Sequence, residues 1–158
     1  MANVERLKVN FNTLEEFKRF RENGLEELSM LEELNENIIE NSVHSPFYGI
    51  YEDGKLAARM SLYYIDAKYD RYFKPPSNHY ELWKLEVLTG YKGRGYGTAL
   101  VEFAKSLDKP IKVNVRRQSH PFFMRLGFKP VKYNAGRDRG ENPYIWIPEG
   151  SSVCQVSD

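Results

Sequence analysis

Hydrophobic residues recur at helical spacing in two stretches near the start of the chain. Residues 4 to 10 alternate loosely, as an edge strand does, and Thr13-x-x-Glu16 offers a capping box in front of the first stretch. We expect this helix to begin near residue 14 and to end around Asn23-Gly24. A second helix, which Ser29 would cap, is indicated by four apolar residues: Leu28, Leu31, Leu34 and Ile38.

The middle of the chain has the pattern of strands. Residues 47 to 51 and 56 to 64 are strand-like runs, and the Asp53-Gly54 pair between them is a strong hairpin signal. Residues 68 to 79 contain two adjacent prolines and cannot continue a central strand, so we expect a long loop there. Residues 80 to 88 form the next predicted strand.

The last third of the chain alternates helices and strands. One apolar helical face begins at Ala99 and ends before Pro110, and a strand is expected at residues 111 to 115. Ser119 can cap a short helix that Gly127 closes. Two further strands are predicted on either side of a polar loop, at residues 131 to 134 and 144 to 147.

Length and composition are those of one compact domain. The 158 residues are 41% hydrophobic, enough for a substantial core, and we place the domain at residues 1 to 148, followed by a flexible tail at 149 to 158. No apolar run approaches the roughly 20 residues of a membrane span, and no signal peptide is evident. The only cysteine, Cys154, rules out internal disulfides and zinc sites built from several cysteines. We therefore expect a cytoplasmic protein that does not bind a membrane.

The net charge of +1 conceals an uneven distribution. Residues 14 to 40 hold nine Glu against three Lys and Arg, whereas residues 84 to 140 hold thirteen Lys and Arg against four Asp and Glu. Two solvated faces would explain this, but a polyanionic ligand would prefer the second region. Nucleic-acid binding would rest on basic residues such as Arg116 and Arg117 without an interleaved aromatic motif, so we do not expect it.

A glycine-rich turn joins the predicted strand at 80 to 88 to the following helix. Such a turn directs several backbone N–H groups and the positive end of the helix dipole at one place, where an anion can bind. Gly93, Gly95 and Gly97 let the backbone approach a phosphate without side-chain obstruction. Their spacing fits neither a dinucleotide-binding GxGxxG loop nor a P-loop, which disfavours a nicotinamide or P-loop nucleotide site.

The stretch LEVLTGYKGRGYGTALVEFAK resembles the motif of the GNAT acyltransferase superfamily, [QR]xxGx[GA], between that family's fourth strand and third helix. Here the motif is Lys92-Gly93-Arg94-Gly95-Tyr96-Gly97, with Lys92 where the family usually has Arg or Gln. The resemblance covers roughly residues 45 to 133, because the later elements follow in the family's order. It implies an α+β, GNAT-like fold, with a central mixed, mostly antiparallel sheet of about six to seven strands and helices on both faces.

By the same resemblance, the cofactor is acetyl-CoA or coenzyme A. Main-chain groups of Leu85, Val87 and Leu88 would pair with its pantetheine arm like an added strand. The pyrophosphate would lie on the glycine turn, at Lys92, Gly93, Arg94, Gly95, Tyr96, Gly97 and Thr98. The alternative is a turn that only connects strand and helix.

Acyl transfer to an amine requires a group that removes a proton. A lysine-like amine of pKa about 10.4 is neutral only about once in 2,500 at pH 7, which corresponds to about 4.6 kcal/mol. The candidate base is Glu81, which falls at the position of the catalytic glutamate in the histone-acetyltransferase branch and by alternation shares a face with Trp83, Leu85 and Val87. Glu86 is the weaker candidate, and an exposed or ion-paired Glu81 without a catalytic role is the alternative.

Many family members carry a tyrosine, four residues before a Gly-Phe pair, that protonates the departing CoA thiolate. Here that position is Phe123. A thiol of pKa about 8.5 lies only about 1.5 units from neutrality, so the missing donor costs roughly 2 kcal/mol at pH 7. Solvent, Tyr133 or Tyr144 could supply the proton instead.

The leading hypothesis is an N-acyltransferase that moves acetyl from acetyl-CoA directly to a primary amine of a small molecule or peptide. No serine or cysteine lies in a nucleophile motif, so we expect no covalent enzyme intermediate. His44, His79 and His120 lack metal-like spacing, and we expect no metal site. The second hypothesis is a catalytically weak or inactive CoA-binding sensor. Family resemblance is also compatible with a homodimer.

Overall fold

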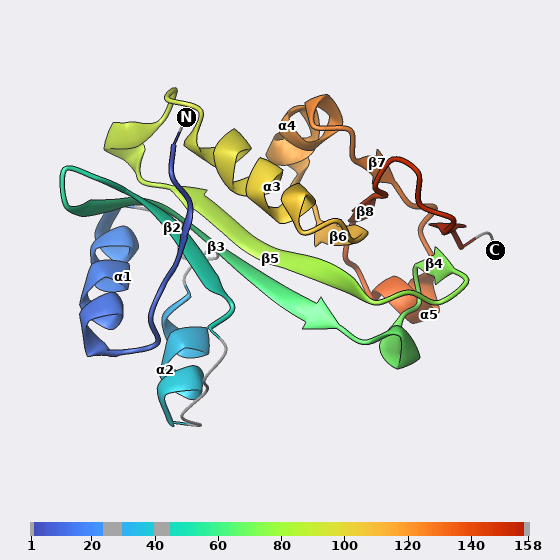
Figure 1. The fold of residues 1–158 in the computed structure, drawn as a ribbon, viewed down its shortest axis with the longest axis horizontal. Coiled ribbons are helices and arrows are strands. Elements are labelled where there is room, and N and C mark those ends of the chain that lie inside the picture. Colours follow the sequence, from blue (N-terminus) through green and yellow to red (C-terminus); the bar gives the residue numbers. More distant parts are fainter. Residues whose placement is uncertain (1, 24–29, 40–44, 157–158) are drawn as a thin grey trace. The chain divides into compact units, whose positions relative to one another are not determined.

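The computed structural model describes residues 2–23, 30–39 and 45–156. Within these ranges seven strands form one sheet in the order β1-β2-β3-β5-β6-β8-β7 (Figure 1). Strand β5 pairs with β6 in parallel, whereas the pairs β1–β2, β2–β3, β6–β8 and β7–β8 are antiparallel, which confirms the mixed, mostly antiparallel sheet. The strands of this sheet are β1 Glu5–Arg6, β2 Phe47–Glu52, β3 Lys55–Ile65, β5 His79–Val87, β6 Ile111–Asn114, β7 Lys129–Pro130 and β8 Pro143–Trp146.

The chain forms two compact units. One consists of residues 1–62 and 84–103, and the other of residues 63–83 and 104–158. The predicted boundary of a single domain at residue 148 stays a prediction. The helices of the described ranges are α1 Phe11–Asn23, α2 Leu31–Ile39, α3 Tyr96–Ser106, α4 His120–Arg125 and α5 Ala135–Asp138.

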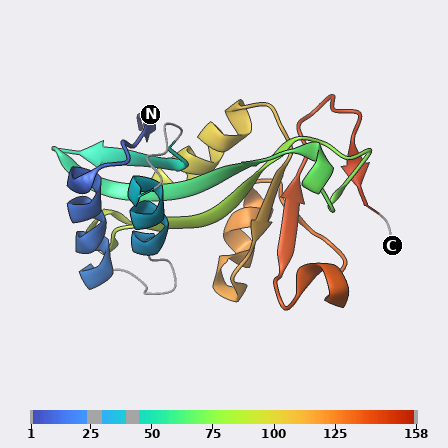
Figure 2. The ribbon, with the colours of Figure 1, turned by 90° about the horizontal axis from the view of Figure 1, so that it is seen from below.

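In the first unit, helices cover both faces of strands β2 and β3 (Figure 2). Helices α1 and α2 lie side by side on one face, where the rings of Phe17 and Phe47 meet edge to face at 5.5 Å. Because side chains alternate along a strand, the next residue, Tyr48, points to the other face and contacts Phe103 of α3 at 5.0 Å. The core under α1 and α2 consists of Leu7, Leu14, Phe17, Phe20, Met30, Leu34, Phe47 and Leu56.

Helix α1 begins at Phe11, three residues earlier than the hydrophobic pattern predicts. Its cap is Asn10, whose side-chain oxygen accepts the Thr13 N–H at 2.9 Å, so Asn10 satisfies one of the unpaired N–H groups of the first turn. Thr13 is buried inside the helix, and the prediction that it caps the helix is wrong. The other two predicted boundary signals, Ser29 and Gly24, lie outside the described residues.

The predicted hairpin between β2 and β3 is confirmed. Glu52 pairs with Lys55, and the two turn residues have positive φ angles, 50° at Asp53 and 78° at Gly54. Two consecutive left-handed residues are the signature of the turn that matches the twist of antiparallel strands, and Asp-Gly is among the sequences that form it most readily. The hairpin therefore fixes Glu52 beside its tip.

A buried ion pair joins β3 and β5 beneath α1. Arg59 and Glu86 are 3.0 Å apart and nearly without solvent exposure, and the guanidinium lies over the rings of Phe17 and Phe20, at 4.8 and 4.3 Å. Burial lowers the pKa of Arg59, although the Glu86 carboxylate opposes this shift. Glu86 thus has a structural partner in the core.

In the second unit, the polar segments contain more structure than the sequence pattern predicts. The expected loop at 68 to 79 contains β4 Phe73–Lys74, which pairs with β9 Cys154–Gln155 in the segment expected to be a flexible tail. Asp70 organises this region by accepting the N–H groups of Tyr72 and Ser77, both at 2.8 Å. Strand β7 ends at Pro130, before the predicted strand at 131 to 134, and helix α5 lies in the expected loop at 135 to 142.

Candidate active site

The glycine turn lies between β5 and α3, as the sequence predicts. A short 3-10 helix, Thr89–Tyr91, follows β5, and the exposed residues Lys92 to Gly95 lead into α3. The first helical hydrogen bond of α3 runs from the Ala99 N–H to the Gly95 carbonyl at 3.0 Å. The N–H groups of Tyr96, Gly97 and Thr98 precede it, so they form the positive end of this helix.

Two of the three glycines are required by backbone conformation. Gly93 and Gly95 have φ angles of 83° and 81°, a region that L-residues with a side chain rarely adopt. A Cβ atom built at either position meets no heavy atom within 4 Å, so the surrounding space is open. The backbone of the turn is therefore exposed and not covered by neighbouring side chains at these two glycines.

Two large residues of the turn, Arg94 and Tyr96, are tied to the β2–β3 hairpin. Tyr96 donates its hydroxyl hydrogen bond to Glu52 Oε1 at 2.6 Å, and Arg94 forms an ion pair with Glu52 Oε2. The Arg94 guanidinium also lies over the ring of Tyr91 at 5.1 Å. Nothing in the local spacing of the sequence indicates Glu52, because it lies 42 residues before Arg94.

The end of β5 presents main-chain groups at the positions predicted for pantetheine pairing. The Lys84 N–H donates to Ser61 Oγ at 3.1 Å and the Leu88 N–H to the Ala57 carbonyl at 2.8 Å, so both point toward β3. Successive N–H groups of a strand point to opposite edges, which directs those of Leu85 and Val87 away from β3. The Leu88 carbonyl accepts the Tyr91 N–H at 2.8 Å, so both main-chain groups of Leu88 already have partners.

The carboxylate of Glu81 lies next to a buried lysine. Lys112 occupies the facing position on β6, and its ammonium donates to Glu81 Oε1 and to Glu141 Oε2, each at 3.0 Å. Lys112 is 3% exposed, whereas the side chains of Glu81 and Glu141 are 33% and 41% exposed. Glu81 is thus an ion-paired carboxylate that solvent can still reach.

Burial along β5 is consistent with alternation from Leu82 to Glu86. These two buried residues are four positions apart, as period two requires of one face, whereas the buried His79 lies an odd number of positions before each of them. The shared face of Glu81, Trp83, Leu85 and Val87 stays a prediction. Trp83 is 49% exposed, with its ring 5.5 Å from that of Tyr63.

The aromatic residues considered as proton donors occupy different environments. Phe123 is buried, and its ring packs on Phe128 at 5.3 Å. Tyr133 is 55% exposed and accepts the Gly140 N–H at 3.0 Å. Tyr144 is buried, and its hydroxyl is hydrogen-bonded to Nδ1 of His120, a residue exposed at the start of α4. Of the two tyrosines, Tyr144 therefore has a buried hydroxyl with a titratable partner.

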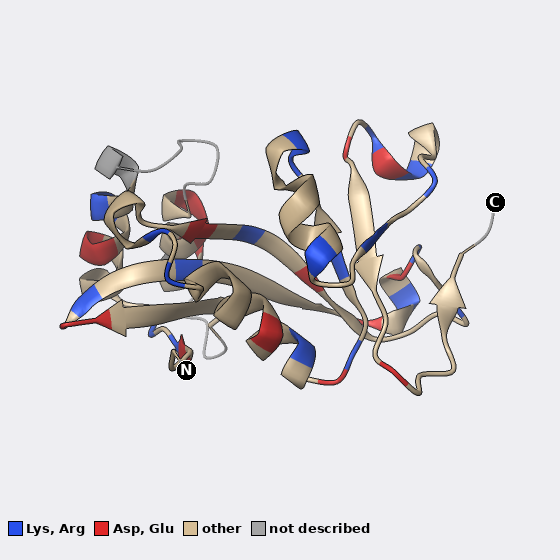
Figure 3. Cartoon of the chain, turned by 90° about the horizontal axis from the view of Figure 1, so that it is seen from above, with Lys and Arg blue, Asp and Glu red and all other residues tan. Residues whose placement is uncertain are grey.

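Acidic and basic residues are interspersed along the fold (Figure 3). Several basic residues of the segment 84 to 140 are neutralised by carboxylates: Lys84 by Glu33, Arg94 by Glu52, Lys112 by Glu81 and Glu141, and Arg137 by Asp138. The positive excess counted in the sequence is thus partly compensated in the structure.

Two other kinds of site concern metal ions and membranes. Among residues 2–23, 30–39 and 45–156, no three His, Cys, Asp or Glu side chains are grouped so that they could hold a metal ion. His44 lies outside these ranges. None of the helices in the same ranges combines the length and the apolar character of a membrane-crossing segment.

Comparison with known proteins gives a consistent result. Residues 11–128 match the sequence model of the acetyltransferase (GNAT) family. An uncharacterized N-acetyltransferase of Brevibacillus brevis is 62% identical over 149 residues, covering 94% of this chain and 96% of that protein. The uncharacterized N-acetyltransferase YlbP of Bacillus subtilis is 59% identical, covering 94% and 93%.

Solved structures agree with this fold. The crystal structure of Bacillus subtilis YlbP in complex with coenzyme A matches with a TM-score of 0.78 at 58% identity, covering 94% of this chain and 98% of that one. PaiA N-acetyltransferase of Thermoplasma acidophilum shares the fold alone, with a TM-score of 0.61 at 16% identity and coverage of 93% and 99%. Because the family match spans most of the chain and close relatives align over nearly all of it, the chain belongs to the acetyltransferase (GNAT) family.

Proposed function

We propose that this acetyltransferase moves an acetyl group from acetyl-CoA directly to a primary amine of a small molecule or a peptide. The observation that carries the proposal is the glycine turn at the start of α3, where open backbone and helix N–H groups converge. Anions bind at such a place because the N–H groups have no partner within the helix and the helix dipole is positive there. The coenzyme A complex of the 58% identical YlbP supports the choice of ligand.

The residues of the turn fit the phosphates of coenzyme A. Gly93 and Gly95 leave the backbone uncovered, and the N–H groups of Tyr96, Gly97 and Thr98 supply hydrogen bonds to the pyrophosphate, with the exposed cation of Lys92 beside them. Leu85 and Val87 offer main-chain groups to the pantetheine arm on the edge of β5 away from β3. The Leu88 N–H is taken by the Ala57 carbonyl, so the main-chain group that Leu88 offers is its carbonyl, which can accept a second hydrogen bond besides that from Tyr91.

Glu81 is the proposed acceptor of the proton from the attacking amine. When bound, acetyl-CoA supplies an activated thioester, whose acyl carbon the amine attacks while the thiolate leaves. Glu81 is 33% exposed and lies 3.0 Å from the Lys112 ammonium, so solvent and an amine can reach it, and it can take the proton directly or through a water molecule. Glu86 is excluded from this role, because its carboxylate is buried with Arg59.

The proton for the leaving thiolate is assigned to Tyr144. Its hydroxyl is buried and hydrogen-bonded to the exposed His120, so a proton given to the thiolate can be replaced from His120 and from solvent. This pair would take over the task of the family tyrosine. Phe123, which stands at the position of that tyrosine, has no proton to donate.

The test of the proposed function is acceptor-dependent release of thiol. Purified protein is mixed with acetyl-CoA and a panel of primary amines, including polyamines and peptides with a free amino group, and free thiol is measured. An active enzyme releases thiol, and mass spectrometry detects the acetylated amine. A CoA-binding sensor would bind coenzyme A in calorimetry yet release no thiol with any amine, and this result would replace catalysis by the second hypothesis.

A further inference from the structure

The glycine turn alternates glycines with two large side chains, and both side chains end on one carboxylate. In Gly93-Arg94-Gly95-Tyr96-Gly97, the residues with side chains are Arg94 and Tyr96. Arg94 contacts Glu52 Oε2, and the Tyr96 hydroxyl contacts Oε1, so each carboxylate oxygen has its own partner. Glu52 is the last residue of β2, next to the tip of the hairpin.

The carboxylate of Glu52 is ionised at neutral pH. Hydrogen bonds from Tyr96 and Arg94 lower its pKa, because both stabilise the charged form. A negative charge beside a site for phosphates is unfavourable by Coulomb's law alone. Its presence at this place therefore calls for a gain that outweighs the repulsion.

We propose that Glu52 is a positioning residue for the phosphate-binding turn. It holds the side chains of Arg94 and Tyr96 against the β2–β3 hairpin and thereby keeps them clear of the N–H groups at the start of α3. This inference rests on the proposed function, since it concerns the same acetyl-CoA site.

Three observations support this role. A Cβ atom at Gly93 or Gly95 would meet no heavy atom within 4 Å, so no neighbouring segment supports the turn at these two positions, whereas Arg94 and Tyr96 between and after them contact Glu52. The hairpin that carries Glu52 is anchored by the tight Asp53-Gly54 turn, which provides a rigid support. Stacking of Arg94 on Tyr91 holds the guanidinium from a second side.

The experiment is calorimetric titration of coenzyme A into wild type and the variants Glu52→Ala and Glu52→Gln. We expect Glu52→Ala to raise the Kd about tenfold, because the turn loses two charge-assisted or strong hydrogen bonds that organise it. Glu52→Gln keeps an oxygen for Tyr96 and should give a smaller increase. In acetyl transfer, KM for acetyl-CoA should rise while kcat stays within about twofold.

Two controls separate positioning from other effects. Glu15→Gln removes one negative charge from the exposed Glu15–Lys18 pair on α1 and should leave the Kd unchanged. In the double variant Arg94→Ala/Tyr96→Phe, Glu52→Ala should have little further effect, because no tethered side chain remains. Thermal unfolding of each variant shows whether it is folded.

Each outcome decides between alternatives. Coenzyme A binding that is unchanged or tighter in both Glu52 variants would overturn the inference, and tighter binding would mean that freed Arg94 is itself a phosphate ligand. An equally large effect of Glu52→Ala in the double variant would also overturn it. If wild type does not bind coenzyme A at all, the proposed function fails, and the inference fails with it.

Discussion

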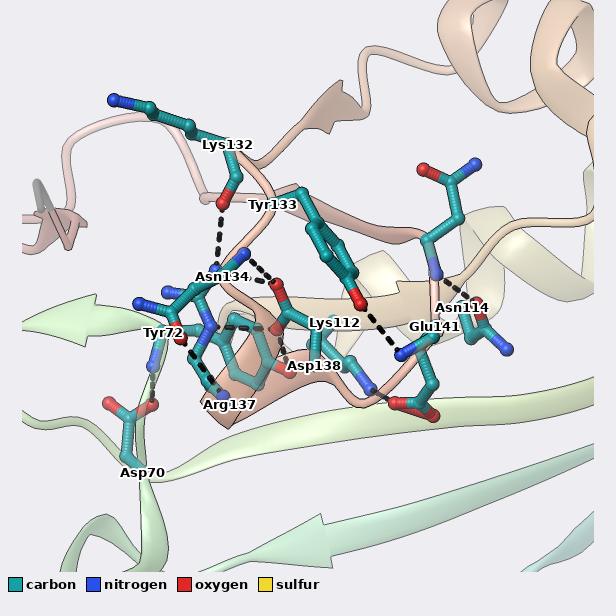
Figure 4. Close-up of polar contacts among 12 residues, drawn as sticks. Asp70, Tyr72, Lys112, Asn114, Lys132, Tyr133, Asn134, Arg137, Asp138 and Glu141 are labelled. Carbon is teal, nitrogen blue, oxygen red and sulfur yellow. Dashed lines mark hydrogen bonds and ion pairs between the residues drawn. The ribbon is translucent and has the colours of Figure 1, made fainter.

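Lys112 donates a hydrogen bond to Glu81 at 3.0 Å from the facing position of the neighbouring strand. The same ammonium reaches Glu141 at 3.0 Å and lies 5.2 Å from the centre of the Tyr72 ring (Figure 4). Burial disfavours the charged lysine, but the Glu81 carboxylate and the hydrogen bonds to both glutamates raise the pKa of Lys112 above its ordinary value. A permanent positive charge therefore stands beside the proposed base.

Loss of the lysine of this cluster should slow the reaction, whereas loss of its second glutamate should not. Lys112→Met removes the hydrogen bond that holds the Glu81 carboxylate in place, so kcat/KM should fall about tenfold. Glu141→Gln leaves the bond from Lys112 to Glu81 intact, so kcat/KM should stay within about twofold. The measurement is kcat/KM at pH 7 for wild type and both variants.

Lys129→Met is the matched control for Lys112→Met, because Lys129 is an exposed lysine of β7. It should leave kcat/KM unchanged. Equal kcat/KM values in wild type and Lys112→Met, with thermal unfolding showing folded protein, would remove Glu81 from the mechanism and leave it as the ion-paired strand glutamate of the alternative interpretation.

The conformation of the glycine turn predicts different effects for two glycines that are equally uncrowded. A Cβ atom at Gly95 or at Gly90 meets nothing within 4 Å, but only Gly95 has a positive φ angle. Gly95→Ala should raise the Kd for coenzyme A about tenfold, because a left-handed alanine costs roughly 1–2 kcal/mol and distorts the turn. Gly90→Ala should bind as wild type does, and calorimetry of both variants checks the prediction. A normal Kd for Gly95→Ala would contradict it.

Elements set by local rules were predictable from the sequence. The hairpin followed from Asp53-Gly54, and the site turn followed from the glycine spacing and the family resemblance, because turn conformation depends on the residues within the turn. The start of α1 was missed because its cap, Asn10, is followed by the exposed Phe11, which lies outside the buried hydrophobic period that begins at Leu14.

Contacts between distant residues were not predictable in this way. Glu52 and Arg94 are 42 residues apart, and Lys112 and Glu81 are 31 apart, so no local pattern pairs them. Lys112 carried one signal, since a lysine between Ile111 and Val113 of a buried strand needs a partner charge. The β4–β9 pair also escaped, because strands of two residues are too short for a period to appear.

Tyr144 should be needed for catalysis chiefly below the pKa of the leaving thiol. Tyr144→Phe should reduce kcat about tenfold or more at pH 7, since protonation of the thiolate is worth roughly 2 kcal/mol there, and the loss should shrink as the pH passes about 8.5. Tyr133→Phe is the control, because its hydroxyl only accepts the Gly140 N–H. The measurement is kcat as a function of pH for wild type, Tyr144→Phe and Tyr133→Phe. Equal kcat values for Tyr144→Phe and wild type at pH 7 would assign the proton to solvent.

The buried carboxylate of Asp138 should make stability depend on pH in the acidic range. Hydrogen bonds from Arg137, the Asn134 N–H and Tyr72 lower the pKa of Asp138 to about 2, with the Arg137 bond contributing most (Figure 4). A carboxylate whose pKa is lower in the folded state stabilises the protein above its unfolded pKa, and this contribution is lost as the pH falls through the folded value.

Asp138→Asn should therefore lower the free energy of unfolding by about 2 kcal/mol at pH 7, because hydrogen bonds to a charged group are lost, and by much less near pH 2. Urea unfolding at pH 7 and pH 2.5 measures the difference from wild type at each pH. Asp53→Asn serves as the control, since Asp53 is exposed in a left-handed turn that asparagine also favours. A deficit of Asp138→Asn that stays equal at both pH values would mean that packing, rather than the ionised carboxylate, explains the contribution of Asp138.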